Sequence, residues 1–105
     1  MQIIRDIAAL RPAVRRLRGD GGTLALVPTM GALHEGHLAL VAEARRKADH
    51  VAVSIFVNPT QFGPNEDFAA YPRDETRDAA LLVDAGATLL WAPDAATMYP
   101  PGHAS

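Results

Sequence analysis

Runs of hydrophobic residues predict three short, buried β-strands, at residues 23–27, 51–57 and 88–92. Apolar and polar positions do not alternate regularly in these runs. Such runs are typical of strands in a parallel sheet that is covered on both faces. A proline stands just after each run, and we expect it to stop the strand. These prolines are Pro28, Pro59 and Pro93.

Apolar residues at spacings of three and four predict a first helix that reaches Arg18. Pro12 interrupts this pattern, so the helix either starts late, with Pro12 in its first turn, or bends there. Ile3 and Ile4 belong to the helical pattern, but they could instead form a short edge strand. The sequence leaves both alternatives open.

Two further helices are expected between the predicted strands. The first covers residues 35–48. The second starts at residues 72–75, where a proline precedes two acids, and it stops at Gly86. Its inward face is predicted to consist of Ala79, Leu82 and Val83.

Strands that alternate with helices indicate an α/β fold, with a parallel sheet between two layers of helices. Three such strands make one mononucleotide-binding half of a Rossmann-like, doubly wound sheet. We therefore expect residues 1–105 to form the first, β-α-β-α-β part of such a domain. Ligands of these sheets gather at the carboxyl ends of the strands.

Composition excludes several classes of function. The 105 residues carry 10 basic and 12 acidic side chains, a net charge of −2, so no basic surface is predicted for nucleic acid. There is no cysteine, which excludes disulfides and thiolate metal sites. No apolar run approaches the ~18 residues that span a membrane, and the start does not resemble a signal peptide. We expect a cytoplasmic protein.

The most informative stretch is residues 28–37, which follows the first predicted strand. It combines a glycine loop with a helix start that carries His34 and His37. Unpaired amides and the helix dipole at such a turn favour an anion, phosphate first of all. The imidazoles can donate hydrogen bonds to phosphate oxygens, and Gly36 would let a nucleotide approach the backbone.

Other interpretations of this stretch have less support. Gly31 and Gly36 have the spacing of a P-loop, but His37 and Leu38 replace its lysine and its hydroxyl residue. A zinc site on His34 and His37 lacks an evident third ligand. The two histidines could also be polar residues that merely complete a turn.

Several separated motifs resemble one enzyme family. Residues 29–37, TMGALHEGH, are similar to the His-x-Gly-His signature of the nucleotidyltransferase superfamily. VSIFVNPxQF at residues 53–62, YPR at 71–73 and MYP at 98–100 follow in order. Together these motifs resemble the pantoate–β-alanine ligase family over nearly the whole chain.

The resemblance implies a ligase reaction in two steps. ATP would adenylate the carboxylate of pantoate and release pyrophosphate, and β-alanine would then attack the adenylate to give pantothenate and AMP. Mg²⁺ would accompany ATP, held mainly by phosphate oxygens and water. His37 would be the main catalytic residue, with His34 beside it on the phosphates.

The resemblance also implies two sets of binding residues. The predicted ATP contacts are Met30, Gly31, His34, Gly36 and His37. The predicted contacts for pantoate and β-alanine are Gln61, Asn58 and Tyr71. Each of the latter has a plainer interpretation: Asn58 before a proline is a common turn signal, Tyr71 could simply pack under the loop, and Gln61 could be structural too.

Members of this family are longer than this chain. Their remaining part carries a lysine, a second glutamine and a serine/arginine-rich loop, none of which has a counterpart here. We therefore expect an N-terminal part, nearly inactive alone, of an enzyme that forms a homodimer. The alternatives are a non-catalytic nucleotide-binding module with the same half-sheet, or a metal-dependent hydrolase that uses His34 and His37.

Overall fold

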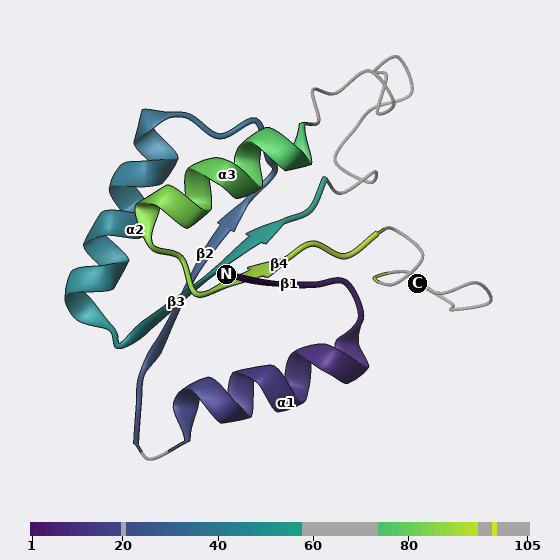
Figure 1. Ribbon diagram of the computed structural model, residues 1–105, viewed down its shortest axis with the longest axis vertical. Helices are drawn as coiled ribbons and strands as arrows, with labels where there is room; N and C mark the ends of the chain where they lie inside the picture. The colour runs from purple at the N-terminus through teal and green to yellow at the C-terminus, as the bar shows by residue number, and fades with distance from the viewer. Residues whose placement is uncertain (20, 58–73, 95–97, 99–105) are drawn as a thin grey trace.

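Four parallel strands form a single sheet in the computed structural model, which describes residues 1–19, 21–57, 74–94 and 98 (Figure 1). The strand order is β1-β4-β3-β2. The strands are β1 (Gln2–Ile4), β2 (Leu24–Thr29), β3 (His50–Ile55) and β4 (Leu89–Trp91). The helices are α1 (Ile7–Arg18), α2 (Glu35–Lys47) and α3 (Glu75–Ala85).

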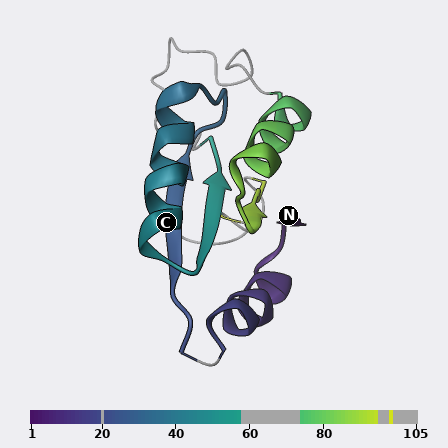
Figure 2. The same cartoon turned by 60° about the vertical axis from the view of Figure 1, so that its left-hand side comes forward.

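Helices cover both faces of the sheet, which confirms the predicted three-layer α/β fold. On one face, α1 packs over a small core that contains Ile4, Ala13, Ala52 and Leu89. On the other face, α2 and α3 pack over a larger core that contains Val41, Val51, Val53, Leu82 and Leu90. Figures 1 and 2 place α1 on one side of the sheet and α2 with α3 on the other.

The N-terminal segment resolves the alternatives that the sequence left open. Ile4 is 3% exposed and pairs with Trp91 of β4, so residues 2–4 form an edge strand. Asp6 then caps α1, since its carboxylate accepts a hydrogen bond from the Ala9 amide at 2.7 Å. Pro12 lies inside this helix on its exposed side. The sheet therefore has one strand more than the three predicted.

The prediction that Pro28 closes its strand is wrong, because β2 continues through it to Thr29. The carbonyls of Thr23 and Thr29 accept hydrogen bonds from amides of β3 and the residue after it. Backbone groups of successive residues point to opposite sides of a strand, so those of Pro28 face away from β3. That side is the open edge of the sheet, where a missing N–H breaks no ladder.

The two helices after β2 agree closely with prediction, and Gly86 ends α3 with a left-handed φ of 87°. A Cβ atom there would lie 2.6 Å from the Arg45 guanidinium, which would have to move aside, so it is the left-handed φ that favours glycine. The prediction that Val83 faces inward is wrong, since it is 54% exposed and Leu81 packs against the core instead. None of the helices described is long and apolar enough to cross a membrane.

Candidate active site

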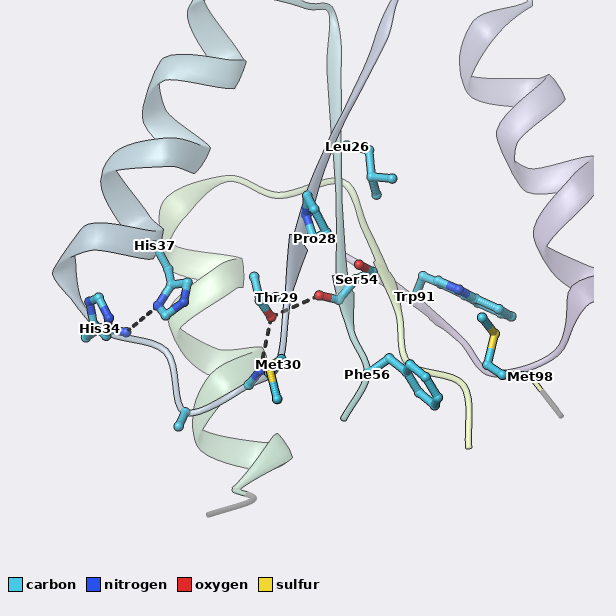
Figure 3. A pocket seen from close by; sticks show the side chains of 12 residues that line it. Leu26, Pro28, Thr29, Met30, His34, His37, Ser54, Phe56, Trp91 and Met98 are labelled. Atoms are coloured by element: carbon cyan, nitrogen blue, oxygen red, sulfur yellow. Dashed lines mark hydrogen bonds between the residues drawn. The ribbon is translucent and has the colours of Figure 1, made fainter. Parts of the chain in front are cut away.

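The carboxyl ends of β2, β3 and β4 border an open cavity of about 750 Å³ (Figure 3). This volume is within the usual range for small-molecule sites, and its position is the one expected for a ligand of a parallel sheet. The loop after β2 and the start of α2 form one end of the cavity. Phe56, Trp91 and Met98 lie at the other end.

The loop after β2 is a tight turn with two successive left-handed residues. Gly31 has a φ of 85° and Ala32 a φ of 52°. The Thr29 hydroxyl donates to the Ser54 carbonyl at 2.9 Å and accepts from the Gly31 amide at 3.2 Å. A Cβ atom on Gly31 would lie 3.2 Å from Cγ2 of Ile55, so the loop passes very close to β3.

The two histidines form a reciprocal cap at the start of α2. His34 is the N-cap residue, and its Nδ1 accepts a hydrogen bond from the Gly36 amide at 3.0 Å. The amide of His34 donates in turn to Nδ1 of His37 at 3.2 Å. The arrangement is a capping box in which imidazoles take the places of the usual hydroxyl and carboxylate.

This cap determines the tautomer of both rings. An Nδ1 that accepts a hydrogen bond carries no proton, so each neutral ring has its proton on Nε2. The pKa of His37 is lowered from 6.5, first because burial disfavours the charged ring and next because His34 is near, while Asp78 opposes the shift. His34 and His37 therefore supply the cavity with Nε2–H donors.

Backbone amides of the loop are already used within the protein, so the expectation that they are unpaired is wrong. Those that donate to protein acceptors belong to Gly31, Ala32, Leu33, His34 and Gly36. Gly36 also has a structural role beside the expected one. A Cβ atom there would lie 2.8 Å from Cε1 of His34, so glycine makes room for the capping ring.

Asp78 is the main residue of this region that sequence reasoning missed. It lies in the first turn of α3, is 1% exposed, and accepts from the amides of Ala32 at 3.0 Å and Leu33 at 2.9 Å. A signal for it existed, because it stands four residues before the buried Leu82 and so on the inward face of a predicted helix.

The structure brings most of the predicted ATP residues together. Met30, Gly31, His34 and His37 line the cavity, and Gly36 lies beside them under the His34 ring. Asn58, Gln61 and Tyr71, the residues predicted for pantoate and β-alanine, lie outside the described residues. Trp91 belongs to the run at residues 88–92 that we expected to be buried; it is partly buried and lines the cavity.

Two carboxylates in this region, those of Asp78 and Glu75, are engaged by other groups of the protein. Asp78 is held by the two loop amides and by Arg77, whose Nη1 lies 3.2 Å from its Oδ1. Glu75 forms an ion pair with Arg5. Within the described ranges, no three His, Asp or Glu side chains are grouped so as to hold a metal ion.

Known proteins of one family match almost the whole chain. The family model Pantoate-beta-alanine ligase matches residues 2–105. The pantothenate synthetase of Sphingopyxis alaskensis is 73% identical over 105 residues, and the chain spans 38% of its length. That of Rhizorhabdus wittichii is 67% identical, with 37% of its length covered.

Two solved structures extend the comparison to three dimensions. Pantothenate synthetase from Thermus thermophilus matches the whole chain with a TM-score of 0.90 and 53% identity, over 36% of that protein. The Francisella tularensis ligase, solved in complex with beta-gamma ATP and beta-alanine, matches with a TM-score of 0.88 and 38% identity, over 40% of its chain. The chain belongs to the pantoate–β-alanine ligase family.

Proposed function

We propose that residues 1–105 are the N-terminal part of the ATP- and pantoate-binding domain of a pantoate–β-alanine ligase. The complete ligase joins pantoate to β-alanine through a pantoyl-adenylate intermediate and releases AMP and pyrophosphate. The observation that carries the proposal is the pair of Nε2–H donors, on His34 and His37, at one end of the cavity. Family membership supports the choice of substrates.

The histidines bind the phosphates of ATP in this proposal. During adenylation the bond between the α- and β-phosphates breaks, and negative charge builds on the departing pyrophosphate. A donor that is already oriented by the cap stabilises this charge without reorganising. His37 is assigned the catalytic role, because its ring is the more buried of the two and its Nδ1 is engaged by the cap, which leaves Nε2–H as the donor.

Pantoate would bind where the chain leaves β3. Asn58, Gln61 and Tyr71 follow β3 in sequence, and the carboxyl end of β3 borders the cavity. An amide side chain such as that of Gln61 can donate to a carboxylate and accept from a hydroxyl, both of which pantoate carries. The roles of these three residues rest on the family motifs.

Mg²⁺ would reach the site together with ATP. The described residues fit an ion held by phosphate oxygens and water, because the nearby carboxylate of Asp78 is occupied by loop amides and Arg77. When bound, the ion would neutralise phosphate charge. The two histidines and the dipole of α2 would orient the same phosphates from the protein side.

We also propose that the complete ligase is a cytoplasmic homodimer. Sedimentation of the purified complete ligase tests its assembly, and fractionation of cells tests its location. A monomer at all concentrations would rule out the dimer.

The reaction itself is tested by pantoate-dependent exchange between ATP and radioactive pyrophosphate. We expect the complete ligase to catalyse this exchange only with pantoate present, and to release AMP rather than ADP when β-alanine is added. Binding of ATP without exchange would favour the non-catalytic nucleotide-binding module. Exchange that does not depend on pantoate would refute the assigned substrate.

A further inference from the structure

Asp78 is a buried acidic side chain that the proposed chemistry does not use. Its relative exposure is 1%, and it stands in the first turn of α3, which its charge suits because of the helix dipole. Oδ2 accepts from the Ala32 amide at 3.0 Å, and Oδ1 from the Leu33 amide at 2.9 Å. Arg77 lies 3.2 Å from Oδ1. The carboxylate thus accepts hydrogen bonds from two successive amides of the loop after β2, 46 and 45 residues away in sequence.

The loop at residues 31–33 has an unusual backbone that needs stabilising contacts from outside the loop. Ala32 has a φ of 52°, a left-handed conformation that a residue with a Cβ atom rarely adopts. A turn of this kind points successive N–H groups into one concavity, which suits an anion. In this chain the anion is the carboxylate of Asp78, which both neutralises the concavity and stabilises the unusual backbone.

The position of the loop sets the position of the histidines. Leu33, whose amide donates to Asp78, immediately precedes the N-cap residue His34 and is itself 1% exposed. The His34 ring then caps the helix through Gly36, and the His34 amide holds His37. A shift of the loop would therefore move both rings together.

We propose that Asp78 is a positioning residue for adenylation, which holds the loop at residues 31–33 so that His34 and His37 meet the phosphates of ATP. This inference rests on the proposed function of the two histidines. Asp78 does not touch the substrate in this account. It positions the loop through the hydrogen bonds that it accepts from the Ala32 and Leu33 amides.

The test is Asp78→Asn in the complete ligase, with Asp84→Asn as the matched control. Asparagine keeps the shape but presents an NH₂ group to one of the two amide donors, so one hydrogen bond is replaced by a repulsive contact. We expect the rate of pantoate-dependent exchange to fall about 10- to 100-fold, the order of loss that follows from a misplaced catalytic group. Asp84 is exposed on the same helix, and its substitution should leave the rate within about twofold of the original, as surface changes usually do.

A second readout separates positioning from mere loss of stability. The charge of Asp78 raises the pKa of His37, against the larger effect of burial. In folded Asp78→Asn the imidazole NMR signal of His37 should therefore titrate at lower pH than in the unsubstituted protein. A folded variant with an unchanged rate of exchange between ATP and pyrophosphate would overturn the proposal. So would a variant in which this rate falls while the His37 titration is unchanged.

Hydrogen exchange of the unsubstituted protein decides the case where Asp78→Asn does not fold. The Ala32 and Leu33 amides should be protected like those inside α3, because both are held by a buried acceptor. Rapid exchange of both would overturn the proposal. If the unsubstituted ligase shows no pantoate-dependent activity, the proposed function fails. Protection of the Ala32 and Leu33 amides and the titration of His37 would still show whether Asp78 fixes the loop.

Discussion

The imidazole rings of His34 and His37 lie with their centroids 4.2 Å apart and their planes tilted by 50°. Each ring uses Nδ1 to accept a backbone N–H at the start of α2. The helix cap and the donors of the site are therefore made by the same two side chains. Changes that disturb the cap should also disturb the chemistry.

His37→Ala in the complete ligase should lower the rate of adenylation by ~10²-fold or more, because an oriented donor to the developing charge is lost. The fold should survive, since His37 is only partly buried. Pantoate-dependent exchange between ATP and pyrophosphate measures the rate. His50→Ala is the control, because His50 begins β3 at the end remote from the cavity. An unchanged rate in His37→Ala would remove it from the catalytic role.

Acid should weaken the start of α2 through His37. The pKa of His37 in the folded chain is lowered from 6.5. At pH values between this lowered pKa and 6.5, the unfolded chain therefore binds more protons than the folded chain. The stability that this group contributes is fully present above pH 6.5 and is lost as the pH falls through the lowered value. Protonation also turns Nδ1 from an acceptor into a donor that opposes the His34 amide.

Urea unfolding at a series of pH values measures this effect. His37→Gln is the control, because glutamine at this position of a capping box can accept the same amide without titrating. The acid-side loss of stability should be smaller in the variant than in the original chain. An equal loss in both would show that other groups cause it.

Gly36→Ala distinguishes helix propensity from the needs of the cap. Propensity alone predicts that alanine inside a helix stabilises the protein by roughly 0.5–1 kcal/mol over glycine. The added Cβ atom would lie 2.8 Å from Cε1 of His34 and so displace the ring. Loss of an N-cap costs about 0.5–2 kcal/mol. We expect the cap to prevail, and the variant to be less stable in urea.

The exposed edge of β2 should cause the isolated 105-residue chain to self-associate. Among the described residues β2 pairs with β3 alone, and Leu26 on it is 62% exposed. Leu26→Lys should reduce association in sedimentation velocity, because a charge on an edge strand opposes pairing. Leu40→Lys is the control, since Leu40 is 56% exposed but lies on α2. A monomer at high concentration would contradict the prediction.

The parallel sheet and its two helical layers could be predicted because burial on both faces leaves a continuous apolar run in each long strand. β3 is the clearest case, since Val51 and Val53 are buried in the core under α2 and α3 while Ala52 between them is buried in the core under α1. β1 was ambiguous because three residues are too few to separate a strand from a helical period. Its identity depends on β4, a partner far along the chain, where Gln2 pairs with Leu89.

Several residues that line the cavity could be singled out from the sequence, but their hydrogen bonds could not be predicted. The motif around His34 and His37 identified the helix start, and the glycines identified the turn. The sequence could not show that Asp78 accepts from the loop amides, because that contact joins the loop to α3, with α2 and β3 between them in the chain. Nor could it show which ring nitrogen of each histidine carries the proton, since that depends on the cap geometry.

Pro28 limits what can be added beside β2. On the open side of this strand, Leu24 and Leu26 present N–H groups, but Pro28 has none. A neighbouring strand could therefore form regular hydrogen bonds along the first part of β2 and would lose its donor at Pro28, which lines the cavity. The hydrogen-bond ladder to an added strand would therefore be interrupted beside the cavity, while the sheet could still be widened along the first part of β2.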